Sequence, residues 1–270
     1  MIEVVADDFK IPWLISILLV VGTAGGLWYF LKTADQLAPT AAAPEPLPAE
    51  IEPELPRYPM PARSEPQPGT GPLIPLPSLD DGGAYFRMSL LDVFGNDMGE
   101  LLVAELLIEK IVTTMDNLPR SHISNRIRPI GPVSGMFEVV DLDDDQKYIL
   151  SESNYRRYDY HVDMFTNADL DAFFDSYQRF YPLLQEAFVG LGYPQGYLND
   201  RVVEVIDHLL DTPYVEGPIR LVRPHVLYEF SDPELEALSS GQKMMLRMGR
   251  DHAAQVQQTL RRFRTLIAGA

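Results

Sequence analysis

The chain has 270 residues, of which 46% are hydrophobic, and a formal net charge of −17. This charge disfavours a nucleic-acid partner, because a phosphate backbone needs a basic surface. The chain has no cysteine, which excludes disulfides, thiolate catalysis and cysteine-ligated zinc or iron–sulfur sites. The length allows one or two domains.

The N-terminal part has the pattern of a membrane anchor. After a tail of residues 1–10, Ile11–Leu31 forms an uncharged run of 21 residues between Lys10 and Lys32. As a helix it spans about 30 Å, the thickness of a hydrocarbon core. A cleaved signal peptide is the alternative, but the run is long and its start acidic for that class. We therefore predict a transmembrane helix over residues 11–31.

The sequence around the span indicates where the protein lies. A short tail before the span and a proline-rich segment after it predict a single-pass protein of the bacterial inner membrane with a periplasmic domain. Because one lysine flanks each side of the span, the positive-inside rule hardly distinguishes the two orientations. Gly22 and Gly26 form a G-x-x-x-G motif, which predicts pairing of two such helices; the alternative is that glycine is common in membrane spans.

Residues 32–77 are predicted to be a linker. Residues 38–77 alone contain 13 prolines. Because proline lacks an N–H donor and fixes φ, neither helix nor sheet can propagate here. The segment is expected to act as an extended spacer that holds the domain away from the membrane. It serves either to present the domain to a partner or as an inert tether.

Residues 78–270 predict a mainly α-helical soluble domain with a small β-hairpin. The clearest helix is 168–191, with Asn167 as its N-cap and an aromatic stripe on one face. A second amphipathic helix covers about 199–210. Two further helices are expected at 84–94 and 104–117. The hairpin is expected at 136–150.

The C-terminal part predicts a further series of helices. Ser231–Glu234 has the pattern of a capping box that opens a helix, and breaks are expected near Gly241 and at Gly249 before a final helix over 250–267. Residues 243–270 carry six Lys or Arg and one Asp. This basic segment is expected to dock on the acidic body of the domain; the alternative is an exposed basic surface.

One acidic motif suggests calcium binding in a context that does not support it. Asp141, Asp143, Asp145 and Glu152 occupy positions 1, 3, 5 and 12 of an EF-hand-type loop, but Gln146 stands where the sharp turn needs glycine. The preceding residues also have a strand pattern. We interpret the motif as an acidic hairpin tip, and the sequence leaves calcium binding open.

No other motif identifies a catalytic or cofactor site. Ser240 and Lys243 match the S-x-x-K of penicillin-binding enzymes, without the companion motifs. Glu204 and His208 have the i, i+4 spacing of a metal pair, without a second pair to complete it. Nucleotide-binding loops and zinc-protease motifs do not occur. We expect no cofactor and no metal.

Two functional hypotheses follow. The first is a non-enzymatic module that binds or scaffolds a protein partner in the envelope; the second is an enzyme that acts on envelope glycan or lipid through a carboxylate pair. A concave pocket with two converging acids would favour the enzyme, and an exposed apolar patch the binding module. The candidate contact residues are Arg120, Arg126, Arg128, Arg220 and Arg223. The alternative is that these arginines pair with the domain's own acids.

Several segments of the soluble domain together carry a family resemblance. They are Thr114–Arg120, Tyr181–Glu186, Asn199–Arg201, Asp207–Leu210, Arg220–Pro224, Tyr228–Phe230, Gly241–Lys243 and Arg247–Gly249. With the anchor and proline-rich stalk, they make the chain similar to a bacterial family known as domain of unknown function 3014. The resemblance covers essentially the whole soluble domain. It implies no activity and therefore no functional residues.

Overall fold

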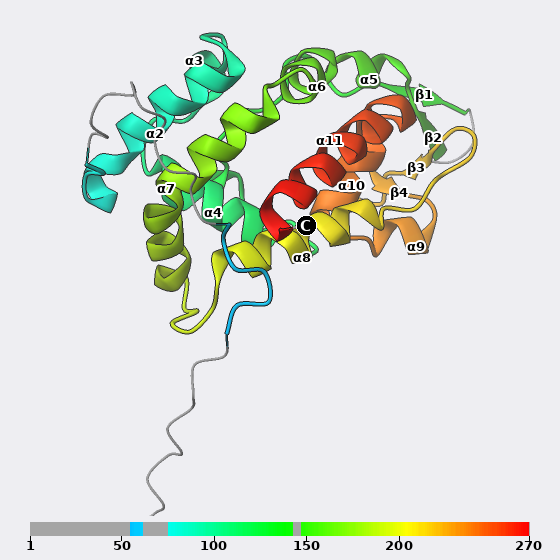
Figure 1. Ribbon diagram of the computed structural model, residues 1–270. Helices are drawn as coiled ribbons and strands as arrows, with labels where there is room; N and C mark the ends of the chain where they lie inside the picture. The colour runs from blue at the N-terminus through cyan, green and yellow to red at the C-terminus, as the bar shows by residue number, and fades with distance from the viewer. Residues whose placement is uncertain (1–54, 62–74, 143–146, 270) are drawn as a thin grey trace, which may run out of the picture. The chain divides into compact units, whose positions relative to one another are not determined.

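The structure is a computed structural model that describes residues 55–61, 75–142 and 147–269 (Figure 1). These residues form ten α-helices, one 3-10 helix and one four-stranded sheet, which confirms the predicted mainly helical class. The predicted transmembrane helix lies outside the described residues. Among the helices that are described, none has the length and hydrophobicity needed to cross a membrane.

The elements have the following bounds. The helices are α2 Leu79–Phe94, α3 Met98–Leu101, α4 Leu107–Asn117, η1 Asn125–Ile127, α5 Ser153–Arg156, α6 Asp159–Thr166, α7 Leu170–Gly190, α8 Leu198–Leu210, α9 Pro233–Glu236, α10 Ser240–Arg247 and α11 Arg250–Ala268. The strands are β1 Val139–Asp141, β2 Lys147–Leu150, β3 Arg220–Val222 and β4 Glu229–Phe230.

Helix α7 forms the centre of the helical body, where it packs against α2, α4 and α11. The predicted aromatic stripe supplies part of its buried face, and Leu191 at the end of the stripe is 37% exposed. The N-cap is Asp169 and not Asn167, because the Asp169 carboxylate accepts hydrogen bonds from the N–H groups of Asp171 and Ala172. The buried members of the stripe are Leu170, Tyr177, Leu184 and Phe188.

Helix α8 confirms the second predicted helix and packs along α11 (Figure 1). Val205, Ile206 and Leu209 of the predicted face are buried. The helix also buries Asn199, which its sequence pattern places at the polar start. Burial of an amide requires hydrogen-bond partners, and those of Asn199 come from three distant segments, as described below.

The N-terminal helices differ from prediction at their starts. Helix α2 begins at Leu79, five residues before the predicted start. Its first turns contain the Gly82-Gly83 pair, whose low helix propensity conceals them in the sequence. Helix α4 begins at Leu107 instead of residue 104. Leu106 before it has a left-handed φ of 51°, and Val103 donates its N–H to the carbonyl of Pro129.

The predicted hairpin is present, and it belongs to a larger sheet. Strands β1 and β2 pair antiparallel, with Val139 opposite Leu150. Strands β3 and β4, which the sequence did not predict, continue the sheet in the order β1-β2-β3-β4. One face buries Leu150, Leu221 and Phe230 against Leu246 of α10, forming a second, smaller core.

A capped helix opens where predicted and a break lies near Gly241, but the capping box and the exact place of the break differ from the prediction. Asp232 caps only the short α9, whereas Ser239 and Gln242 form the capping box that opens α10. Gly241 lies inside α10, where a Cβ would meet the carbonyl oxygen of Leu118 at 3.1 Å. Glycine here therefore allows α10 to approach the end of α4 closely.

Gly249 makes the predicted break between α10 and α11. It has a φ of +86°, and a Cβ at this position would lie 2.7 Å from the ring of Tyr155. Both the left-handed backbone and the ring contact favour glycine. The residue thereby sets the direction in which α11 leaves α10. Its lack of a side chain leaves room for the Tyr155 ring beside the first turn of α11.

We predict that Gly249→Ala lowers the free energy of unfolding by about 1–3 kcal/mol, because it combines backbone strain with a steric contact. Denaturant unfolding of the purified protein measures this change. Gly190→Ala is the matched control, since a Cβ there meets nothing within 4 Å; its effect should stay below about 1 kcal/mol. Equal losses from the two variants would contradict this account of Gly249.

Candidate functional site

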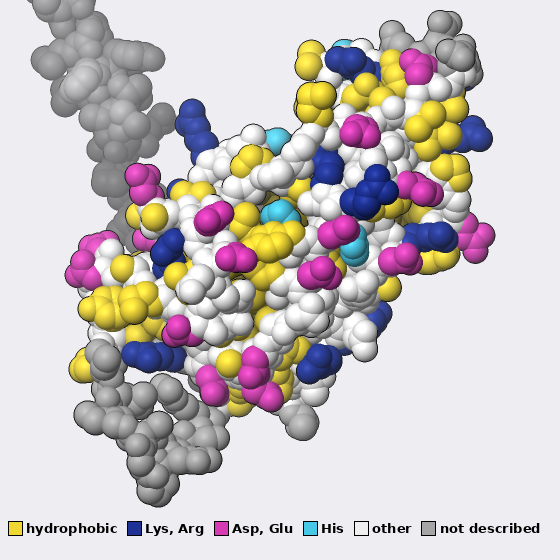
Figure 2. Space-filling view, turned by 90° about the horizontal axis from the view of Figure 1, so that it is seen from above, with side chains coloured by type: hydrophobic (Ala, Val, Ile, Leu, Met, Phe, Trp, Pro, Cys, Tyr) yellow, Lys and Arg dark blue, Asp and Glu magenta, His cyan; other side chains and the backbone are white. Residues whose placement is uncertain are grey.

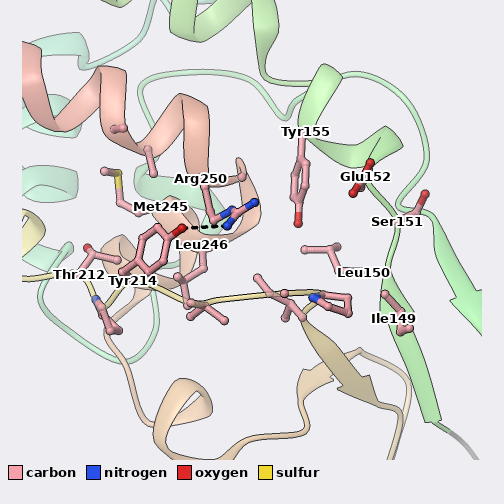
Figure 3. Close-up of a pocket in the computed structure, with 18 of the residues that line it drawn as sticks. Ile149, Leu150, Ser151, Glu152, Tyr155, Thr212, Tyr214, Met245, Leu246 and Arg250 are labelled. Atoms are coloured by element: carbon pink, nitrogen blue, oxygen red, sulfur yellow. Dashed lines mark hydrogen bonds between the residues drawn. The ribbon is translucent and has the colours of Figure 1, made fainter.

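A cavity opens between the sheet, α5 and the junction of α10 with α11 (Figure 3). Its volume is about 510 Å³, within the range of about 300–1,000 Å³ typical of ligand pockets. Apolar side chains form most of the wall: Val140, Ile149, Leu150, Val215, Ile219, Met245 and Leu246. Polar side chains enter from three separate segments.

An arginine and a tyrosine meet at one side of this cavity. Arg250, the first residue of α11, donates a hydrogen bond of 2.8 Å from Nη1 to the hydroxyl of Tyr214. Its guanidinium carbon also lies 5.7 Å from the centre of that ring, within the range of a cation–π contact. Tyr214 comes from the loop after α8 and is 70% exposed. The pair forms a polar rim that ligand and solvent can both reach.

Tyr155 enters from the opposite side, where α5 places its ring against Gly249 and points its hydroxyl into the cavity (Figure 3). Burial is the main cause that raises the pKa of the Tyr155 hydroxyl, and the negative charge of Glu152 adds to the increase. Arg250 acts in the opposite direction. Tyr155 therefore presents a neutral O–H that can donate a hydrogen bond at physiological pH.

The acidic lining of the cavity is limited to one residue. Glu152, which is exposed, is the sole Asp or Glu among the described residues that line the wall. Within the described part of the chain, no group of three or more His, Cys, Asp or Glu is arranged to hold a metal. The arrangement can bind an apolar group and orient a polar one, and it offers no pair of converging carboxylates.

A second polar centre lies around the buried carboxylate of Asp116. Arg201 of α8 donates from Nε to Asp116 Oδ1 at 2.8 Å, and Arg120 donates to Oδ2 at 3.2 Å. The Asp116 side chain is 3% exposed, whereas that of Arg120 is 58% exposed. The Tyr193 hydroxyl lies 3.4 Å from Oδ2. These contacts join α4, α8 and the loop between α7 and α8.

The five candidate arginines lie on two separate groups of elements. Arg120 follows α4, and Arg126 and Arg128 lie in and just after η1, which packs on α4. Arg220 belongs to β3, and Arg223 follows it with its guanidinium 5.3 Å from the centre of the Tyr228 ring. All five are exposed. That these arginines contact a partner remains a prediction.

The remaining sequence motifs, where the structure describes them, make contacts within the domain. Lys243 of the S-x-x-K motif pairs with Glu236, and His208 Nε2 lies 2.8 Å from the Ser239 hydroxyl instead of facing a metal. Asp141 ends β1, which places the acidic motif in a hairpin and not between helices. Gly22, Gly26, Asp143 and Asp145 lie outside the described residues.

The basic C-terminal segment docks on acids in part, as expected. Arg264 donates from Nε and Nη2 to the Asp207 carboxylate at 2.5 and 2.9 Å, and Lys243 pairs with Glu236. His252 lies 3.2 Å from the carboxylate of Asp159. The sequence did not single out Tyr155, Tyr214 or Arg250 as site residues, because they come from segments that are distant along the chain.

The fold and the cavity define a mainly helical domain with a small antiparallel sheet and an open apolar site. The chain matches the model of the family described as protein of unknown function (DUF3014) over residues 107–264, and it belongs to that family. This confirms the resemblance found in the sequence. The match runs from the first residue of α4 into α11 and includes every residue of the cavity wall. Comparison with curated proteins and with solved structures gave no match.

We predict that the Tyr155 hydroxyl ionises above pH 10.0, its ordinary value. Because its pKa is raised in the folded state, the stability that this group contributes is complete below about pH 10 and decreases as the pH rises further. The difference in tyrosinate absorbance between the wild type and Tyr155→Phe isolates this titration. Arg250→Gln should raise the pKa further. A Tyr155 titration at or below pH 10 would contradict the burial argument.

Proposed function

We propose that the domain is a protein-binding module whose cavity accepts an apolar side chain of its partner. The observation that carries the proposal is the cavity itself, an open space of about 510 Å³ with a largely apolar wall and a polar rim. A buried apolar or aromatic anchor surrounded by a polar rim is the usual source of binding energy in protein interfaces. Arg250 and Tyr214 would orient main-chain groups beside the anchor.

Exposed apolar residues next to the cavity support a protein as the partner. Hydrophobic side chains lie among charged ones at the sheet end of the molecule, at the upper right of Figure 2. Val140 lines the cavity and is itself 51% exposed, so it connects the two features. Exposed apolar patches of this kind mark interaction sites. The exposed large apolar residues of the β1–β2 and β3–β4 regions are Met136, Phe137, Val140, Leu142, Val226 and Leu227.

The wall of the cavity does not favour glycan hydrolysis. That chemistry uses two carboxylates on either side of the scissile bond, about 5–10 Å apart. Glu152 has no acidic partner among the described residues of the wall. A binding role needs only the shape, the apolar wall and the polar rim, which is why it is the function proposed.

We predict that a photocrosslinker at Val140 captures one partner protein in native membranes. Adding Ala254→Trp should reduce the yield about tenfold or more, because the indole fills the cavity and loss of an anchor pocket costs about 2 kcal/mol. Ala254 lines the cavity, whereas its exposed neighbour Gln255 does not. Gln255→Trp on the same helix is therefore the matched control and should leave the yield unchanged.

A second control tests whether capture is specific to the sheet end. Val189 of α7 is 39% exposed and lies away from the cavity wall. A photocrosslinker there should not capture the same protein. Identical products from positions 140 and 189, or a yield that responds equally to Ala254→Trp and Gln255→Trp, would overturn the proposed site. The captured protein, once purified, should bind the wild type and lose affinity for Ala254→Trp.

We also propose that the segment Ile11–Leu31 anchors the module in a bacterial inner membrane with the domain on the periplasmic side. The length and apolar character of this segment support the proposal. We predict that a C-terminal alkaline phosphatase fusion is active and that a C-terminal fusion to a cytosol-dependent fluorescent protein is dark. A fluorescent, phosphatase-negative pair of fusions would place the domain in the cytoplasm and contradict the orientation.

A further inference from the structure

A short segment before the first described helix is held by the domain as if it were a bound peptide. Residues 55–61 lie inside the range predicted as a linker, and they run beside α8 (Figure 1). The N–H groups of Arg57 and Tyr58 donate to the two carboxylate oxygens of Asp200 at 2.9 and 2.7 Å. The amide of Asn199 donates to the Tyr58 carbonyl at 2.8 Å and to that of Ile267 at 2.8 Å.

The two central side chains of the segment are contacted as well. The Arg57 guanidinium pairs with Glu204, one turn along α8 from Asp200. The guanidinium carbon of Arg264 lies 5.9 Å from the centre of the Tyr58 ring. Asp207 holds that arginine in place through a bidentate ion pair, so the cation above the ring is fixed before the segment binds.

The segment bends at Arg57 and Tyr58, and one side of it faces the domain. Pro56, Tyr58 and Met60 are half-buried, while the residues between them are exposed. This alternation shows that every second side chain of the segment turns toward the domain. Tyr58 and Met60 pack against the main core. Gln178 of α7 donates from Nε2 to the carbonyl of Pro61 at 2.8 Å.

These contacts combine main-chain and side-chain recognition. A carboxylate that accepts from two successive N–H groups fixes the register of the peptide, and the flanking prolines lower the entropy lost on binding. The acid at Glu204 and the cation at Arg264 select for an arginine followed by an aromatic residue. Asn199 is buried and also accepts a hydrogen bond from the Tyr177 hydroxyl, so its amide is oriented by the core.

We propose that α7, α8 and α11 form a peptide-recognition site for proline-flanked Arg-Tyr segments, and that its occupant is residues 55–61 of the same chain. The site, here called the α8 docking site, consists of Gln178, Asn199, Asp200, Glu204 and Arg264. It fastens the linker to the domain, so that the chain from the N-terminus reaches the body at α8 before it reaches α2. This inference does not depend on the cavity at the sheet end.

A labelled synthetic peptide of residues 55–61 tests the proposal with the full chain. In a variant carrying Arg57→Ala and Tyr58→Ala, the chain's own segment is weakened and the α8 docking site becomes available. The peptide should bind this variant at least about tenfold more tightly than it binds the wild type, whose site is occupied. Asp200→Ala added to the variant should abolish the gain, and a peptide with both residues replaced by alanine should not bind.

Equal binding of the peptide to the wild type and to the variant would overturn occupancy by the chain's own segment. Absence of binding to a variant that retains the wild-type circular dichroism spectrum would overturn the recognition site itself. Binding that persists after Asp200→Ala would show that the contacts described above do not hold the peptide.

A second measurement leaves the segment unchanged and therefore does not depend on the folding of the double variant. Trypsin cuts after arginine, and docking should protect the bond between Arg57 and Tyr58 in the wild type. Asp200→Ala should increase the rate of this cut by about tenfold or more, because protection follows the population of the docked state. The cut after Arg264 in α11 is the internal control for global unfolding. Equal rates at Arg57 in the wild type and Asp200→Ala would overturn the proposal.

Discussion

The arrangement of the helices depends on how the buried carboxylate of Asp116 is satisfied. A charge in the interior is strongly unfavourable unless it is paired and hydrogen-bonded. Arg201 supplies the pair, and its second nitrogen donates to the Asp116 main-chain carbonyl at 3.0 Å. This bidentate contact can form only if the end of α4 faces the first turns of α8. Loss of the Arg201 side chain would leave Asp116 with the exposed Arg120 as its remaining cation.

Once α8 is fixed in this way, its polar residues determine what surrounds it. Asn199 and Asp200 hold the segment of residues 55–61, and Asp207 holds α11 through Arg264. His208 contacts the capping residue Ser239 at the start of α10. The apolar face of the same helix meanwhile packs into the main core. The polar residues of one amphipathic helix thus contact three neighbours: the docked segment, α11 and the start of α10.

The sequence predicted the elements whose information is local. Helices α7, α8 and α11 have clear 3.6-residue periodicity, and Gly249 marks the break before α11 through its need for a positive φ. Strands β3 and β4 were missed because they have three and two residues, too few to show an alternation. Strand β3 pairs with β2, more than 60 residues earlier in the chain, so no local pattern indicates that contact.

The sites could not be predicted for the same reason. Tyr155, Tyr214 and Arg250 have no characteristic spacing, and they meet only because the sheet, the loop after α8 and the start of α11 converge. Residues 55–61 were predicted as linker because prolines exclude regular structure. That argument is sound for secondary structure, but it does not exclude docking of an irregular segment, which uses hydrogen bonds to side chains elsewhere.

The central claim is that α8 recognises the chain's own linker through Asp200 while the other end of the domain is left to bind a partner. Amide hydrogen exchange at Arg57 and Tyr58 in the full chain tests it most directly, because both N–H groups donate to Asp200. We predict that both amides are protected in the wild type and lose that protection in Asp200→Ala, while the amides of α8 remain protected. Exchange of both amides at the rate of an unstructured peptide in the wild type would contradict the claim.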